Sequence, residues 1–194
     1  MSIKNSIISE IFKSILFTED EKNAIASKLD ILNLKKGETI LKAGETVFNQ
    51  YYVYNGCLRT YFIDNSGKEH TLQFAIKDWW ISDYTAFFTT KKAIMYIETI
   101  QDATLYRISK ENMEALFIEI PQLETFFRKK MEGAFTSFQL RILASLSQSA
   151  KERYISFISN YPNIEQNVKN FHIASYLGIT TESLSRIRKE IALH

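Results

Sequence analysis

The segment 170–189, NFHIASYLGITTESLSRIRK, constrains the fold most, because its apolar residues are spaced for two short helices joined by a tight turn. Gly178 stands where the first helix must end, since a left-handed residue is needed there and only glycine adopts that conformation at low cost. Thr180 follows at a position from which its hydroxyl can cap the second helix. Ala174 is small enough for the second helix to cross close to it, and Leu184 would face the first helix. The segment therefore predicts two helices that cross at short range.

This spacing of small, glycine and apolar residues is the pattern of a DNA-binding helix-turn-helix. An ordinary helical hairpin with a glycine turn is the alternative, but it leaves the polar outward face of the second helix unexplained. Side chains on that face can donate to and accept from base edges and phosphates. The candidate base-contacting residues are Thr181, Glu182, Ser185 and Arg186, and the candidate phosphate-contacting residues are Lys169, Asn170 and Lys189.

Several polar residues of this segment also have a structural interpretation. Arg186 can be an ordinary solvated charge, and Glu182 can be placed in the first turn to suit the helix dipole. Arg188 is expected to point away from DNA. His172 is expected at the surface or on the phosphate side rather than as a metal ligand.

Composition excludes several classes of protein. The 194 residues carry 24 basic and 22 acidic side chains, so the net charge is only +2 and any attraction to DNA must come from local clustering. Cys57 is the single cysteine, which excludes an internal disulfide and a cysteine-based metal cluster. The sequence shows no signal peptide and no run near the roughly 18 apolar residues of a membrane span. A cytoplasmic protein without catalytic or metal-binding residues is expected.

Residues 32–76 predict a string of short strands separated by turn residues. Asn55-Gly56 is a strong hairpin signal within this string. An aromatic-rich segment at 78–92 predicts a short helix or buried loop, after which strands resume at 93–100 and 103–108. Several short strands at regular spacing are typical of a sandwich or barrel.

One long helix is predicted over residues 122–146, with apolar residues on two sides, so it needs two partners. One partner would be the barrel and the other the same helix of a second copy, although a helix buried within one chain remains an alternative. The stripe with coiled-coil-like spacing, which is the candidate dimer seam, consists of Phe127, Met131, Ala134 and Phe138. The residues expected to pack against the barrel instead are Phe126, Phe135 and Leu146.

Helices at the start of the chain, a small barrel, one long helix and a helix-turn-helix, in this order, resemble the Crp/Fnr family of bacterial transcription regulators. The segments that carry the resemblance are KKGETILKAGE at 35–45, YYVYNGCLRTYF at 51–62, DNSGKEHTLQF at 64–74 and IASYLGITTESLSRIRK at 173–189. The resemblance implies an α+β fold with N-terminal helices, a cyclic nucleotide-binding-type β jelly roll, a long dimerisation helix and a minimally winged helix-turn-helix.

The same resemblance implies three parts: a sensor domain at 1–120, a dimerisation helix at 121–146 and a DNA-binding domain at 147–194. It also implies a homodimer that binds a palindromic operator in double-stranded DNA, and it allows a contact with RNA polymerase. Only a few residues separate Pro162 from Val168, so any wing must be very short.

The chain departs from the family pattern where nucleotide-binding members hold the cyclic phosphate with backbone N–H groups and an arginine, and the ribose with a carboxylate. Here Asp83 could replace the carboxylate, while Ala93 and Ile94 stand where the arginine would be. A buried phosphate without a cation is poorly compensated, so binding of cyclic AMP is disfavoured. The cysteine cluster that would hold iron and sulfur is also absent.

The sequence leaves open whether the barrel holds another small-molecule effector or is filled by its own aromatic side chains. The candidate pocket residues are Trp80, Ser82, Asp83, Tyr84 and Tyr96, with Trp79 beside them.

Two other classes of function compete with a DNA-binding regulator. The weak net charge and short wing would also suit a small-molecule sensor that signals through protein contacts. A metal-dependent jelly-roll enzyme would need clustered histidine and carboxylate ligands, but only His70 lies in the predicted barrel. We therefore expect a non-enzymatic, sequence-specific transcription regulator.

Overall fold

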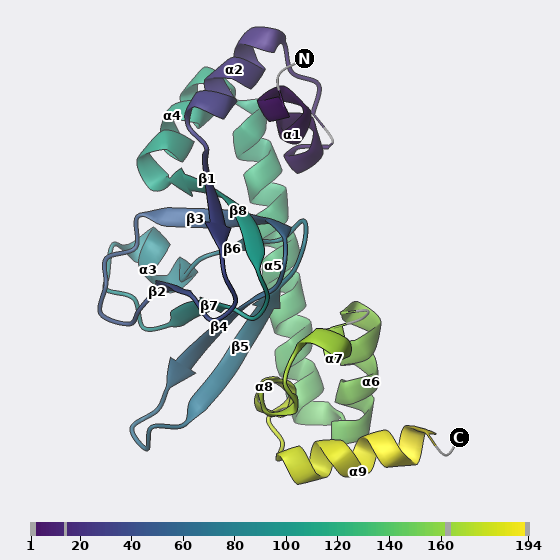
Figure 1. Cartoon of the computed structure of the whole chain (residues 1–194). Helices are drawn as coiled ribbons and strands as arrows, with labels where there is room; N and C mark the ends of the chain where they lie inside the picture. Colours follow the sequence, from purple (N-terminus) through teal and green to yellow (C-terminus); the bar gives the residue numbers. More distant parts are fainter. Residues whose placement is uncertain (1–2, 14, 162–163, 193–194) are drawn as a thin grey trace.

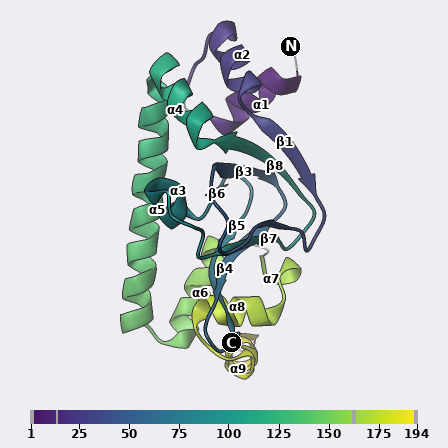
Figure 2. The ribbon, with the colours of Figure 1, turned by 90° about the vertical axis from the view of Figure 1, so that its left-hand side faces the viewer.

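The computed structural model describes residues 3–13, 15–161 and 164–192. A β-barrel forms the middle of the molecule, with helices above it and a helical head below it (Figure 1). One long helix runs beside the barrel from the upper helices down to the head (Figure 2). In the described part of the chain no helix has both the length and the apolar character that crossing a bilayer requires.

Two short helices, α1 (Ile3–Ile11) and α2 (Glu19–Ser27), come first. Thr18 caps α2 in a reciprocal arrangement with Glu21. The Thr18 hydroxyl accepts from the Glu21 N–H at 3.2 Å, and the Glu21 carboxylate accepts from the Thr18 N–H at 2.7 Å. The helices expected at the start of the chain are confirmed.

The barrel consists of two four-stranded antiparallel sheets with the strand orders β1-β8-β3-β6 and β2-β7-β4-β5. The first sheet contains β1 (Asp30–Leu34), β8 (Ala103–Ser109), β3 (Asn49–Asn55) and β6 (Trp80–Ile81). The second contains β2 (Thr39–Leu41), β7 (Tyr96–Thr99), β4 (Leu58–Ile63) and β5 (Glu69–Ala75). Strands far apart in sequence are neighbours in both sheets, and this arrangement is the predicted jelly roll.

The turn between β3 and β4 requires glycine. Gly56 has a φ of +95°, and a Cβ on it would lie 2.5 Å from the Asp102 carbonyl oxygen and 2.7 Å from Ala103. The β3–β4 turn therefore lies directly against the β7–β8 turn, which explains the Asn-Gly signal in the sequence.

The aromatic-rich segment contains the predicted short helix, α3 (Tyr84–Thr89), but it begins with the two-residue strand β6, which was not predicted. After β8 come α4 (Lys110–Glu119) and the long helix α5 (Gln122–Ser147). The predicted long helix at 122–146 is thus confirmed.

The head contains α6 (Ala150–Asn160), α7 (Ile164–Asn167), α8 (Asn170–Leu177) and α9 (Thr181–Ala192). Ser149 caps α6 and forms a capping box with Glu152. Between α6 and α8 the structure places α7 where a short wing was expected, and the described residues after β8 contain no strand.

The head shares its hydrophobic core with the barrel. Phe74, which is fully buried on β5, packs against three rings of the head, with centroids 6.1 Å away for Phe157, 6.3 Å for Tyr161 and 5.5 Å for Tyr176. Trp79 adds a further contact to Tyr161 at 5.6 Å. The apolar face of the head is therefore covered by the sensor and not by solvent.

Polar contacts fix the direction of this packing. The Ser175 hydroxyl accepts from the Thr71 N–H at 2.8 Å and donates to the Glu69 carbonyl oxygen at 3.1 Å. Arg141 of α5 donates to the carbonyl oxygens of Leu72 and Tyr176, so the long helix, β5 and α8 meet at one side chain. Helix α8 thus has a defined register along β5.

His172 is buried in the same contact between head and barrel. Its side chain is 6% exposed and its Nδ1 has no hydrogen-bond partner among the described residues. Burial lowers the pKa of His172 to about 4, and the nearby charges of Arg59 and Lys169 act in the same direction. The folded protein therefore holds this imidazole in its neutral form.

Replacing Gly56 by alanine should destabilise the protein much more than replacing Gly67. Both residues have positive φ, +95° and +83°, a conformation that costs other residues about 1 to 2 kcal/mol. Only at Gly56 would the new Cβ also meet backbone atoms, so Gly56→Ala should lower the free energy of unfolding at least twice as much as Gly67→Ala. Urea unfolding followed by circular dichroism measures both, and equal losses would contradict the close contact of the two turns.

The stability of the protein should fall as the pH decreases from about 6.5 to 4. The pKa of His172 is lower in the folded protein than the ordinary value, so the unfolded chain binds the proton more tightly and acid favours unfolding. The expected loss is roughly 3 kcal/mol at pH 4. His172→Gln should flatten this part of the pH profile in urea-unfolding measurements.

Candidate nucleic-acid interface

The two helices α8 and α9 form the predicted helix-turn-helix. Gly178 has a φ of +68°, and the next N–H, of Ile179, donates to the Ala174 carbonyl oxygen at 3.0 Å. The Thr180 hydroxyl accepts from the Ser183 N–H at 3.2 Å, so Thr180 caps α9 as predicted. The inward residues are buried, namely Ile173, Ala174, Leu177, Leu184 and Ile187.

The outward face of α9 is polar and open to solvent. Its exposed residues are Glu182, Ser185, Arg186 and Lys189, and Thr181 is half-buried at the edge of the face. Among the described residues Arg186 forms no ion pair, so its guanidinium is available to an external acceptor. The structure thus brings all four candidate base-contacting residues to one face of one helix.

Glu182 lies in the first turn of α9, where its carboxylate accepts from the Thr181 hydroxyl at 3.1 Å. Hydrogen bonds from its own backbone N–H and from the hydroxyls of Thr180 and Thr181 lower the pKa of Glu182. The helix N-terminus therefore holds this carboxylate charged, while its exposure leaves it within reach of a ligand.

Arg188 points back into the head, in agreement with the sequence-based expectation. It donates to the Tyr154 hydroxyl at 3.1 Å, to the Glu165 carboxylate at 2.9 Å and to Asn170 Oδ1 at 2.6 Å. The side-chain oxygen of Asn170 is thereby occupied, and the N–H groups of the same side chain remain able to donate to a phosphate. Lys169 and Lys189 are both exposed.

The expectation that His172 lies at the surface is wrong. Helix α8 packs flat on β5, and this packing buries the His172 face of the helix against the sensor. The spacing within the segment predicts which residues face α9, but it contains no information about a contact with a distant strand. In the described residues no three His, Cys, Asp or Glu side chains gather where they could hold a metal ion.

A hollow of about 630 Å³ lies between the second sheet of the barrel and the start of α9. Arg59 and Lys68 line it from the barrel, and Lys169, Thr180 and Thr181 line it from the head. One wall of this hollow thus contains residues that the sequence assigns to DNA, and the facing wall contains residues of the sensor.

Arg59 is the buried charge of the barrel wall, and the sequence analysis did not single it out. Its side chain is 3% exposed and forms ion pairs with Glu69 at 2.5 Å and Glu98 at 2.6 Å. Its guanidinium also lies 3.9 Å from the centroid of the Tyr61 ring. Spacing along the chain gives no signal for this cluster, because Glu69 and Glu98 come from other strands, β5 and β7.

Asp83 has a structural role at the position where a ligand carboxylate was considered. It is fully buried, and its Oδ1 accepts from the Thr85 and Ala86 N–H groups at 3.1 and 3.2 Å. Its Oδ2 accepts from the Ile94 and Met95 N–H groups at 2.9 and 3.2 Å. Both oxygens are therefore occupied by backbone donors, and Asp83 holds α3 against the segment before β7.

The other candidate pocket residues also have partners within the fold. Trp80 packs against Phe127 with ring centroids 4.9 Å apart, and Tyr96 stacks on Tyr61 at 5.2 Å. Ser82 donates to a backbone oxygen of β3, and Tyr84 donates to a glutamine of the same strand. None of the five candidate pocket residues lines the hollow beside α9 or the second hollow, which lies beside α1 and α5. Their part in ligand binding therefore stays a prediction.

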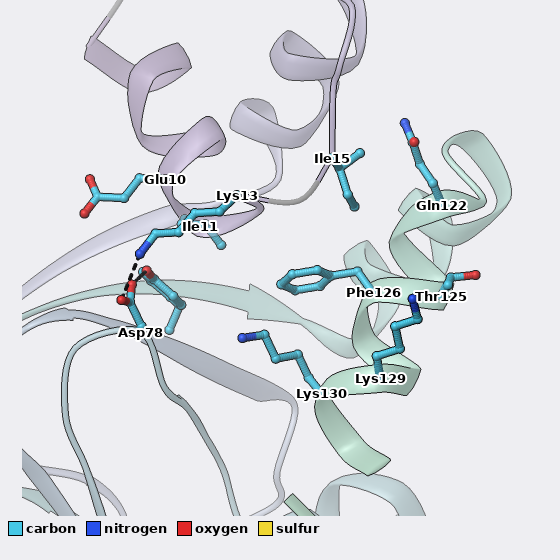
Figure 3. A pocket seen from close by; sticks show the side chains of 11 residues that line it. Glu10, Ile11, Lys13, Ile15, Asp78, Gln122, Thr125, Phe126, Lys129 and Lys130 are labelled. Carbon is cyan, nitrogen blue, oxygen red and sulfur yellow. Dashed lines mark hydrogen bonds and ion pairs between the residues drawn. The ribbon is translucent and has the colours of Figure 1, made fainter. Parts of the chain in front are cut away.

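A second hollow, of about 700 Å³, lies between α1, the turn before β6 and the start of α5 (Figure 3). Lys13 and Asp78 form an ion pair at 2.9 Å on one side of it, and the Tyr52 hydroxyl donates to Asp78 at 2.5 Å. Phe126 and Lys130 face them from α5, as Figure 3 shows. Phe126 thus lies on the inner side of α5, as expected.

The apolar face of α5 differs from the predicted seam. Phe127 is 7% exposed and packs against Phe12 and Trp80, so its assignment to a dimer seam is wrong. Phe135 and Leu146, which were expected against the barrel, are 64% and 80% exposed, so that assignment is wrong as well. Met131 and Ala134 are half-buried. The exposed apolar residues of the lower half are Phe135, Phe138, Leu140, Ile142, Leu143 and Leu146.

The reason is that the buried residues of α5, Leu123 and Phe127, lie in its first two turns, whereas lower down Arg141 provides a polar contact to β5. The predicted stripe had the right spacing, but which side of the helix faces the barrel depends on tertiary packing. The exposed apolar face is therefore turned relative to the prediction and begins later along the helix.

Residues 31–119 match the cyclic nucleotide-binding domain family. The chain is 24% identical over 166 residues to the transcriptional activator protein FnrA of Stutzerimonas stutzeri, covering 79% of this chain and 67% of the relative. It is 25% identical over 167 residues to the anaerobic regulatory protein of Haemophilus influenzae, covering 79% of this chain and 63% of the relative. The chain thus spans about two thirds of the length of these relatives.

Solved structures show the same fold. A transcriptional regulator of the Crp/Fnr family from Eubacterium rectale has a TM-score of 0.70 at 21% identity, covering 91% of this chain and 84% of that one. FixK2 from Bradyrhizobium japonicum has a TM-score of 0.73 at 17% identity, covering 85% of each chain. With its match to the cyclic nucleotide-binding domain family at residues 31–119, the chain is therefore similar in sequence to the transcriptional activator FnrA and has the fold of a solved Crp/Fnr-family structure.

Proposed function

We propose that this protein is a dimeric, sequence-specific DNA-binding regulator of transcription whose sensor domain does not bind cyclic AMP. The observation that carries the proposal is the exposed polar face of α9, on a helix whose opposite face is clamped by buried residues of the head. A helix held in this way can enter a major groove without losing its packing. The transcriptional activator protein FnrA, to which the chain is similar, supports the same role.

Each side chain on the exposed face of α9 suits a different group of the duplex. Arg186 can donate two hydrogen bonds to guanine, Glu182 can accept from cytosine, and the methyl group of Thr181 can contact that of thymine. Lys169 and Lys189 can bind phosphates, which positions the helix without specifying a sequence.

The exposed apolar face of α5 supports the dimer. Six large apolar side chains are exposed on the lower half of this helix, and exposed apolar residues gathered in this way are typical of an interaction surface. Pairing two copies along α5 would cover the patch and present two recognition helices, which read half-sites about 34 Å apart.

The sensor differs from a cyclic nucleotide site in its donors and acceptors. Asp83 is occupied by backbone N–H groups, and Ala93 and Ile94 provide no cation for a phosphate. An effector of another kind would change DNA affinity only if the protein had two arrangements of the head and the effector bound one of them more tightly than the other.

Arg186→Ala should weaken binding to the preferred operator by about 5-fold to 150-fold, which corresponds to about 1 to 3 kcal/mol. It should also relax the base preference at one position, because the bidentate contact to guanine is lost. Selection of bound duplexes from a random library, followed by titration of the selected operator, measures both effects. Lys189→Ala is the matched control and should weaken binding to all sequences alike. An unchanged base preference in Arg186→Ala would count against the assignment.

Ile142→Glu should convert the dimer into monomers and abolish tight operator binding. The substitution places a charge in the centre of the apolar face of α5, where Ile142 is 60% exposed in the single chain. Ile118→Glu is the matched control, because Ile118 is also exposed but lies on α4. Sedimentation velocity gives the oligomeric state of each variant, and a monomeric wild-type protein at micromolar concentration would refute the dimer.

A further inference from the structure

The β4–β5 hairpin extends from the barrel past α8 towards the start of α9, as Figures 1 and 2 both show. Lys68, in the turn of this hairpin, lines the same hollow as Lys169 and Thr181 of the head. A lysine of the sensor therefore lies at the edge of the face that the proposed function assigns to DNA.

Direct contacts hold the hairpin to the helix-turn-helix. Ser175 of α8 bonds to the backbone of Glu69 and Thr71, which follow Lys68 by one and three residues. Arg141 bonds to the backbone of Leu72 and Tyr176, one in the hairpin and one in α8. When α9 docks onto a ligand in this arrangement, the turn of the hairpin therefore approaches the same ligand.

The turn itself has a fixed conformation. Asp64 Oδ1 accepts from the Ser66 N–H at 2.8 Å and from the Lys68 N–H at 3.1 Å, and Asp64 Oδ2 lies 2.7 Å from His70 Nε2. Hydrogen bonds from Ser66 and His70 lower the pKa of Asp64, so the carboxylate stays charged. Because the backbone at Lys68 is already ordered, a contact made there costs little additional conformational entropy.

The local charge favours an anion at this edge. The two glutamates that line the hollow, Glu69 and Glu98, are both paired with Arg59 at 2.5 and 2.6 Å. Lys68 and Lys169 are exposed and have no carboxylate partner in the part of the chain that the structure describes. Two unpaired ammonium groups, one on each wall, thus remain beside the N-terminus of α9.

We propose that Lys68 donates to a phosphate of the operator backbone next to the N-terminal end of α9. The sensor hairpin then supports the recognition helix from the side, a role for which the described part of the head provides no strands of its own. This inference rests on the proposed DNA binding and adds that the sensor domain contacts the duplex. A lysine on a phosphate contributes affinity and orientation but no sequence preference.

The test is Lys68→Gln in the full chain, with affinity measured for the selected operator and for a scrambled duplex over a range of salt concentrations. Loss of one phosphate contact should reduce the slope of log K against log salt by about 0.9. For both duplexes, the ratio of the wild-type binding constant to that of the variant should therefore be about eightfold larger at 0.1 M salt than at 1 M salt. The base preference should not change, and Lys68→Arg should bind like the wild type.

Lys42→Gln is the matched control, because Lys42 is an exposed lysine in another turn of the barrel, after β2. Thermal unfolding of each variant checks that the fold is retained. If the wild type binds the operator but Lys68→Gln keeps its affinity and salt slope, the contact proposed for Lys68 is refuted and DNA binding by α9 stands. If the wild type binds no duplex, both proposals fail.

Discussion

The packing of Phe74 against the rings of Phe157, Tyr161 and Tyr176 is the contact on which the arrangement of the molecule depends. The head consists of short helices, and short helices obtain most of their stability from tertiary packing. Here part of that packing comes from a barrel strand. Without β5, the apolar side of the head would face water, and α9 would have no fixed direction relative to the sensor.

This shared core explains which features could be predicted from the sequence. The helix-turn-helix was predictable because its determinants lie within a few residues of one another. Gly178 ends the first helix, Thr180 caps the second, and Leu184 packs inward. The jelly roll was predictable in outline because Gly56 and the other turn glycines mark the ends of strands. Both predictions depend on interactions between residues close together in sequence, whose spacing along the chain determines which secondary structure forms.

The features that could not be predicted depend on contacts between distant segments. His172 is buried because α8 lies on β5, and Phe127 is buried because α1 and β6 meet the start of α5. Asp83 was a reasonable candidate for a ligand carboxylate, but its acceptor sites are filled by backbone N–H groups on both sides of α3. No spacing rule along the chain reports such partners, so the surroundings of Asp83 were predicted less well than the packing of α8 against α9.

The position of Arg141 has a consequence for genetics. This single side chain joins the long helix α5, the barrel strand β5 and helix α8. Since the three parts are connected at one guanidinium, damage to the barrel wall would reach α8 and α9 without any residue there being altered. A screen for loss of function would accordingly recover substitutions in both halves of the chain, and the two groups would share one phenotype.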